Sequence, residues 1–265
     1  MVMKAIVFFL LLFSFGNREL PKASSSFWSE SVNKINIQKI KIESNKDELP
    51  SLWMSNNFLG FIGLDFQRFY IHIDSVSIGK KENELYNVYG KTKVGDNICN
   101  FTGIFRITET YIYDRDEREL KYKEAESHND AEVMERYKYD KGFIVGEYNL
   151  SENPNQKGSG IFKGIFITNF YIKGGIVKYD NLDFGYSDEF KNNQFVGIWE
   201  SYNTKKEKPC NWGEHRIPYS GDLDIGVGEF SPNKKYLGNG WKTYYQAYYY
   251  DDALAIKEEK SEWWK

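Results

Sequence analysis

Apolar and polar side chains alternate over long stretches of this chain, which is the pattern of half-buried β-strands. The clearest case is residues 69–74, where Phe, Ile and Ile take one face while Tyr, His and Asp take the other. Residues 35–42 alternate in the same way with one slip, and residues 52–64 form a nearly continuous apolar run. The pattern therefore predicts strands in all three stretches, the last of them buried on both faces.

One five-residue phrase, aromatic-x-Gly-Ile-aromatic, occurs three times, at residues 101–105, 162–166 and 195–199. Along a strand the Gly and both aromatic residues share one face. Because Gly weakens a strand, its repetition indicates a geometric need, either sharp coiling or a neighbouring ring lying over bare backbone. The first two copies lie in similar surroundings, so we predict two related hairpins, 84–111 and 143–171, as a degenerate internal repeat.

Short turns link one expected strand to the next, which predicts an all-β fold: an antiparallel meander forming a barrel-like or sandwich domain. Alternation alone leaves the choice between barrel and sandwich open. Between the two hairpins, residues 114–141 are highly charged; we expect a short helix near residues 131–137 and a strand around Leu120 and Tyr122. Residues 252–265 predict a short C-terminal helix capped by Asp252, with Trp263 and Trp264 docking it on the sheet.

The third copy of the phrase, Phe195-Val-Gly197-Ile-Trp199, resembles the Gly-x-Trp signature of calycins such as lipocalins. The resemblance covers these few residues and implies a calycin-like barrel that binds a ligand. In lipocalins the signature lies on the first strand, whereas here it follows most of the expected strands.

The N-terminus predicts export. A short basic start is followed by the uncharged apolar run Ala5–Phe13 and by small residues suited to cleavage. We therefore divide the chain into a signal peptide and leader, 1–25, and a single all-β domain, 26–265, that is periplasmic or extracellular. The apolar run is shorter than a membrane-spanning helix requires, and we expect no transmembrane helix after signal removal.

Charge and composition narrow the classes of partner. The 35 basic and 38 acidic residues nearly balance, so a broad nucleic-acid surface is not expected. Aromatic residues make up 17% of the chain, which suits strands that bury large areas. No cofactor motif is present, and the expected partner is a glycan, an apolar ligand or an envelope protein. The two cysteines, Cys99 and Cys210, could form a disulfide after export, although sequence does not fix their geometry.

The stretch least like a strand is 210–230, within a loop-rich C-terminal segment, 203–241. It gathers Gly, Trp and polar residues in the way that binding loops on a rigid scaffold are composed. We predict a ligand site here, and its candidate residues are Trp199, Trp212, Arg216 and Trp241.

The same stretch offers candidate chemistry. Glu214, His215, Asp222 and Asp224 are the acid/base set that a secreted hydrolase would use, with Glu214 and one Asp as a glycosidase pair. Asp222 and Asp224 are also candidate ligands for calcium, although Leu223 and Ile225 alternate with them as in a strand. We favour a non-catalytic binding domain; a secreted hydrolase and a structural envelope protein are the alternatives.

Overall fold

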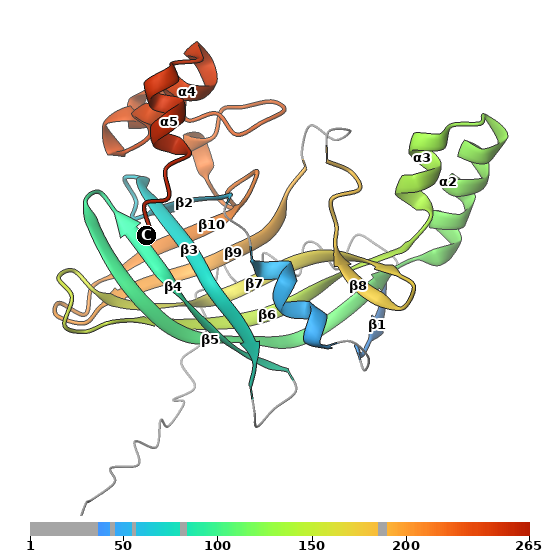
Figure 1. Ribbon diagram of the computed structural model, residues 1–265, viewed down its shortest axis with the longest axis horizontal. Coiled ribbons are helices and arrows are strands. Elements are labelled where there is room, and N and C mark those ends of the chain that lie inside the picture. The colour runs from blue at the N-terminus through green and yellow to red at the C-terminus, as the bar shows by residue number, and fades with distance from the viewer. Residues whose placement is uncertain (1–36, 43–45, 55–56, 80–83, 185–189) are drawn as a thin grey trace, which may run out of the picture.

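The computed structural model describes residues 37–42, 46–54, 57–79, 84–184 and 190–265 (Figure 1). The predicted signal peptide and leader, 1–25, lies outside these residues. The strands are β1 (Ile37–Ile40), β2 (Phe58–Ile62), β3 (Gln67–Ile78), β4 (Leu85–Val94), β5 (Asn97–Tyr113), β6 (Asp140–Glu152), β7 (Gly160–Lys173), β8 (Ile176–Tyr179), β9 (Asn192–Ser201) and β10 (Glu207–Glu214). The helices are η1 (Lys46–Trp53), α2 (Arg115–Ser127), α3 (Ala131–Tyr137), η2 (Gly221–Leu223), η3 (Lys234–Asn239), α4 (Lys242–Tyr250) and α5 (Ala253–Glu259).

Eight of the strands form a closed ring. The order β5-β4-β3-β2-β10-β9-β7-β6 is antiparallel throughout, and the pairing of β5 with β6 joins its two ends. β1 extends the sheet beside β5, and β8 extends it beside β7. The predicted all-β antiparallel meander is confirmed, and the closed pairing gives it barrel-like character. Because closure leaves no free edge among the eight strands, their backbone groups are paired within the ring.

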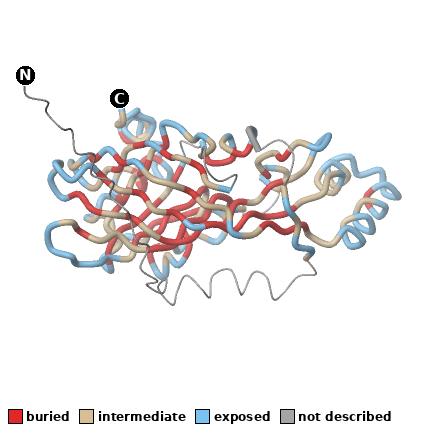
Figure 2. The backbone as a smooth tube through the Cα atoms, turned by 90° about the horizontal axis from the view of Figure 1, so that it is seen from below, coloured by how far each residue is buried: buried red, intermediate tan, exposed pale blue. Residues whose placement is uncertain are grey.

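Aromatic rings fill the interior. Phe105 and Phe195 are fully buried and lie 5.5 Å apart between ring centroids, although their strands do not pair. Trp212 stacks on Phe195 at 4.9 Å from the neighbouring strand β10. Figure 2 shows the buried backbone concentrated in these strands. The largest fully buried side chains are Trp53, Trp212, Trp241, Tyr86, Phe69, Phe105, Phe162, Phe166, Phe170 and Phe195.

The glycines of the repeated phrase make room for these rings. Gly164 and Gly197 lie directly opposite each other on β7 and β9, and Tyr148 lies opposite Gly164 on β6. A Cβ at Gly164 would lie 2.7 Å from the Cα of Gly197 and 2.8 Å from the hydroxyl oxygen of Tyr148. A tyrosine therefore covers two bare backbone positions, which is the second of the two geometric needs anticipated from the sequence. The two expected hairpins correspond to β4–β5 and β6–β7.

We expect Gly164→Ala to lower the free energy of unfolding by roughly 1–3 kcal/mol, because the added methyl group overlaps backbone atoms that cannot move aside. Urea unfolding followed by circular dichroism measures the change. Gly238→Ala in η3 is the matched control, since a Cβ there meets no atom within 4 Å. Equal stability of the two variants would contradict this account of the phrase.

The two ends of the ring differ. The turns β2–β3, β4–β5, β6–β7 and β9–β10 all lie at one end, which we call the mouth. The opposite end is filled by η1, whose Trp53 packs 5.1 Å from Tyr86 and 5.6 Å from Phe105. Residues 52 and 53 thus belong to a helix and not to the predicted strand 52–64, of which 58–62 forms β2. The Trp53 indole N–H also donates to Thr168 Oγ1 at 2.9 Å, which fixes η1 to β7.

Helices α2 and α3 form a hairpin that projects beyond the sheet (Figure 1). Leu120 and Tyr122 lie in α2, so the strand predicted there is wrong. The strand prediction rests on two apolar residues spaced by two, which is too short a pattern to specify a strand. Residues 115–127 contain neither Gly nor Pro, which permits an uninterrupted helix with Asp114 as its N-cap. Helix α3 covers the residues predicted for it. In the described parts of the chain, no helix has the length and apolar character needed to span a membrane.

The C-terminal segment packs on the outside of β2 and β3. Trp241 and Leu223 are fully buried against Phe61 in a second apolar cluster. Asp252 caps α5 by accepting from the Ala255 N–H at 2.8 Å, as predicted. Trp264 stacks on His72 of β3 at 4.1 Å, so the predicted docking of the last tryptophans is also confirmed. Helix α4, directly before α5, was not anticipated.

Candidate functional site

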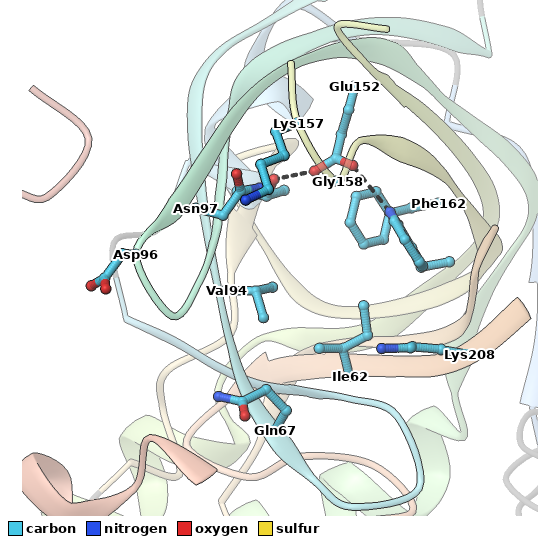
Figure 3. A pocket seen from close by; sticks show the side chains of 12 residues that line it. Ile62, Gln67, Val94, Asp96, Asn97, Glu152, Lys157, Gly158, Phe162 and Lys208 are labelled. Carbon is cyan, nitrogen blue, oxygen red and sulfur yellow. Dashed lines mark hydrogen bonds between the residues drawn. The ribbon is translucent and has the colours of Figure 1, made fainter. Parts of the chain in front are cut away.

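A cavity of about 520 Å³ opens at the mouth of the ring (Figure 3). This is within the range of pockets that hold small organic ligands. Its walls combine apolar side chains with a few polar ones from the eight strands of the ring and from two turns. The lining residues are Ile62, Gln67, Thr92, Val94, Asp96, Asn97, Glu152, Lys157, Gly158, Phe162, Trp199 and Lys208.

Glu152, the last residue of β6, is the buried polar centre of this cavity and is 4% exposed. Its Oε2 accepts from the Gly160 backbone N–H at 2.7 Å and from the Trp199 indole N–H at 3.0 Å. Its Oε1 contacts the Thr92 hydroxyl. Two of these hydrogen bonds are drawn in Figure 3. Three donors from three strands thus hold one carboxyl group in a fixed position.

Strand periodicity explains why a carboxyl group lies here. Ile144, Gly146, Tyr148, Leu150 and Glu152 are spaced by two along β6 and share its inward face. The first four contribute to the packed interior, and Glu152 is the position that reaches the mouth. Burying a carboxyl group costs free energy of folding unless the group is hydrogen-bonded. The three donors around Glu152 offset this cost.

Burial and hydrogen bonding act in opposite directions on this group. Burial raises the pKa of Glu152, while the hydrogen bonds from Thr92, Trp199 and Gly160 lower it; the net direction is upward. Burial also raises the pKa of the nearby Cys99 thiol, and the charge of Glu152 adds to that rise. Cys99 is therefore held as a neutral thiol, contacting the Asn97 amide and the Lys157 carbonyl.

Trp199 is fixed by the same carboxyl group. A Cβ at Gly160 would lie 2.6 Å from the indole Cε2 and Nε1 atoms, so only glycine lets the ring approach Glu152. In the register, Trp199 lies opposite Phe162 on β7 and opposite Lys208 on β10. The Lys208 ammonium is 6.0 Å from the centroid of the Trp199 ring. A cation, an indole and a phenyl ring thus form one row along the cavity wall.

The four residues predicted to bind a ligand are not brought together. Trp199 lines the cavity, whereas Trp212 is fully buried in the interior of the ring. Residues 210–214 are the end of strand β10 and not part of a loop. Trp241 is also fully buried, outside the ring, where its indole N–H donates to the Phe66 carbonyl at 2.8 Å.

Arg216 organises the loop that follows β10. It pairs with Asp224 at 2.6 Å and donates to the carbonyls of Gly226, Val227 and Gly228 at 2.6–3.1 Å. Asp224 in turn accepts from the backbone N–H groups of Gly226 and Ser231, both at 3.0 Å. The donors of Arg216 and the acceptors of Asp224 are thus engaged within the loop.

The four groups predicted as an acid/base set have separate surroundings. Glu214 is buried and accepts from the Tyr179 hydroxyl at 2.5 Å and the Asn193 amide at 3.0 Å. His215 lies between Phe184 and Phe190, and burial lowers its pKa. Asp222 is exposed at the surface and pairs with Lys235, which lowers its pKa.

The possible calcium ligands, Asp222 and Asp224, likewise bond to different cations, Lys235 and Arg216. Across the residues that the structure describes, no group of three or more His, Cys, Asp or Glu side chains is placed to hold a metal ion.

The two cysteines are buried free thiols, so the predicted disulfide is absent from the structure. Cys99 lies on β5 opposite Thr92, and Cys210 lies on β10 between Ile62 and Gly197. Strands β5 and β10 are not neighbours in the ring.

Sequence reasoning missed Glu152, Thr92, Gly160, Lys157 and Lys208. A signal for Glu152 is present, because it continues the inward periodicity of β6 and is the one acidic side chain in that series. Nothing local indicates that Trp199, 47 residues later, supplies one of its donors.

Comparisons with known proteins add no relative. No protein-family model matches the chain, no curated protein matches it, and no solved structure matches it. The function must therefore be argued from the site itself.

Proposed function

We propose that this protein binds a small ligand with a flat apolar body in the cavity at the mouth of the ring. The observation that carries the proposal is the cavity of about 520 Å³ in which Trp199 is held by Glu152 beside Phe162. A fixed indole binds a flat ring with little loss of side-chain entropy, because the protein has already ordered it on folding.

The cavity favours binding over the two alternatives. The hypothesis of a purely structural envelope protein predicts a surface without a concave pocket. The surface of this protein has a pocket lined by apolar and polar groups. For a hydrolase the candidate groups need to converge, and Glu214, Asp222 and Asp224 each have different partners. The site we propose is therefore at Trp199 and not in residues 210–230. Export to a periplasm or out of the cell stays a prediction from residues 1–25.

Phenylnaphthylamine, a neutral dye that fluoresces in apolar surroundings, tests the proposal. We expect one saturable site per chain in a fluorescence titration. Trp199→Leu should weaken binding by roughly tenfold, because loss of one aromatic contact removes about 1.4 kcal/mol. Val94→Phe, which fills the cavity, should abolish binding.

Trp264→Leu is the matched control, since it removes a tryptophan that lies outside the ring against His72. It should leave the affinity for the dye unchanged. Binding that is insensitive to both Trp199→Leu and Val94→Phe would contradict the proposed site.

A further inference from the structure

Two lysines in the cavity wall have no ion pair among the described residues. Lys157 lies in the turn between β6 and β7, and Lys208 lies on β10; both are exposed. Some other lysines of the ring do form ion pairs, such as Lys163 with Glu200 at 2.9 Å and Lys141 with Asp183 at 2.7 Å. Figure 3 shows Lys157 and Lys208 on opposite sides of the cavity.

The acidic residues that line the cavity form no ion pair with these lysines. Glu152 is buried, and its oxygens are occupied by Thr92, Gly160 and Trp199. Asp96 lies in the turn between β4 and β5, and its carboxylate points away from the cavity (Figure 3). The rim therefore presents two ammonium groups that can donate hydrogen bonds to an anion.

The position of Lys208 connects this charge to the ring-binding surface. Its ammonium is 6.0 Å from the centroid of Trp199, and the two residues face each other in the register. A flat ring lying on Trp199 would have its outer edge beside the ammonium. An acidic substituent on that edge would remain at the exposed rim, away from the buried Glu152 carboxyl group.

We propose that the natural ligand is an organic anion: a flat apolar body that enters the cavity beside Trp199, with a carboxylate, sulfonate or similar group held by Lys208 and further attracted by the charge of Lys157 across the rim. This inference rests on the proposed function and adds the charge of the ligand. Its physical basis is that hydrogen bonds between ammonium groups and anions are stronger than those between neutral groups. The inference predicts that the affinity for an anionic ligand falls as ionic strength rises, because salt screens the exposed charges of the rim.

A matched pair of dyes tests the inference. Anilinonaphthalene sulfonate has the ring skeleton of phenylnaphthylamine with an added sulfonate. We expect the sulfonate dye to bind more tightly in low salt. The double variant Lys157→Gln/Lys208→Gln should weaken binding of the sulfonate dye by roughly tenfold or more, because the dye loses a charged hydrogen bond from Lys208 and the attraction of Lys157. It should change binding of the neutral dye by about twofold at most.

Lys121→Gln/Lys123→Gln on the projecting helix α2 removes the same charge far from the mouth and should leave both dyes unaffected. An equal loss in this control would overturn the inference, since net charge would then explain it. Equal binding of both dyes, insensitive to Lys157→Gln/Lys208→Gln, would also overturn it while the proposed function stands. Failure of both dyes to respond to Trp199→Leu and Val94→Phe would overturn both proposals.

Discussion

Trp212→Ala is expected to lower the free energy of unfolding by roughly 3–5 kcal/mol, the cost of a large cavity in a packed core. Trp212 is fully buried, stacks on Phe195 at 4.9 Å and meets Tyr148 at 4.8 Å and Phe69 at 5.6 Å. These neighbours come from three different strands, β9, β6 and β3, and cannot all move inward to fill the space. Guanidinium unfolding, followed by far-ultraviolet circular dichroism, measures the loss.

Tyr250→Ala on α4 provides the comparison, since Tyr250 is 68% exposed and its removal should change stability by about 0.5 kcal/mol or less. A loss below about 1 kcal/mol for Trp212→Ala would mean that the interior is not packed around this residue. It would restore Trp212 as a candidate for the ligand site.

Arg68→Met is expected to lower the free energy of unfolding by roughly 3–5 kcal/mol, because it leaves a buried carboxylate without its partner. Arg68 on β3 forms two hydrogen bonds with Glu259 of α5, at 2.7 and 2.5 Å. The side chains of Arg68 and Glu259 are only 5% and 9% exposed. The guanidinium also lies 4.4 Å from the centre of the Tyr70 ring, which adds a cation–π contact.

The double variant Arg68→Met/Glu259→Met separates loss of pairing from loss of packing. It should recover most of the stability lost in Arg68→Met, because no unpaired charge remains buried. Hydrogen exchange of α4 and α5 should rise in the single variant and return toward the wild-type rate in the double variant. A double variant as unstable as the single one would show that the pair itself is not the source of the effect.

Local patterns predicted most of the strands and the helices α3 and α5, but missed α2 and α4. The alternation at residues 69–74 corresponds to β3, and the phrase at 101–105 lies in β5. Helix α4 was missed because its sequence, Lys-Thr-Tyr-Tyr-Gln-Ala-Tyr-Tyr-Tyr, is rich in a residue that favours strands. Its helical form depends on burying Tyr244 and Tyr245 against the C-terminal segment, which is a tertiary effect.

The predicted site failed for a related reason. Residues 210–214 contain Trp, Cys and Gly and look unlike a strand, yet β2 and β9 pair with them on both sides. Pairing across the ring gives these residues strand geometry that their own composition does not predict. Trp212 is consequently part of the core, and the loop that begins near Arg216 is stabilised by its own hydrogen bonds.

Which side chains share a face of each strand can be read from the sequence, because it depends only on the alternation of the backbone. The all-β class and the glycine positions at 164 and 197 follow from this alternation. The closure of the meander does not follow from it, nor does the meeting of Glu152 of β6, Thr92 of β4 and Trp199 of β9 at the mouth. Closure and register depend on hydrogen bonds and packing between strands far apart in the chain.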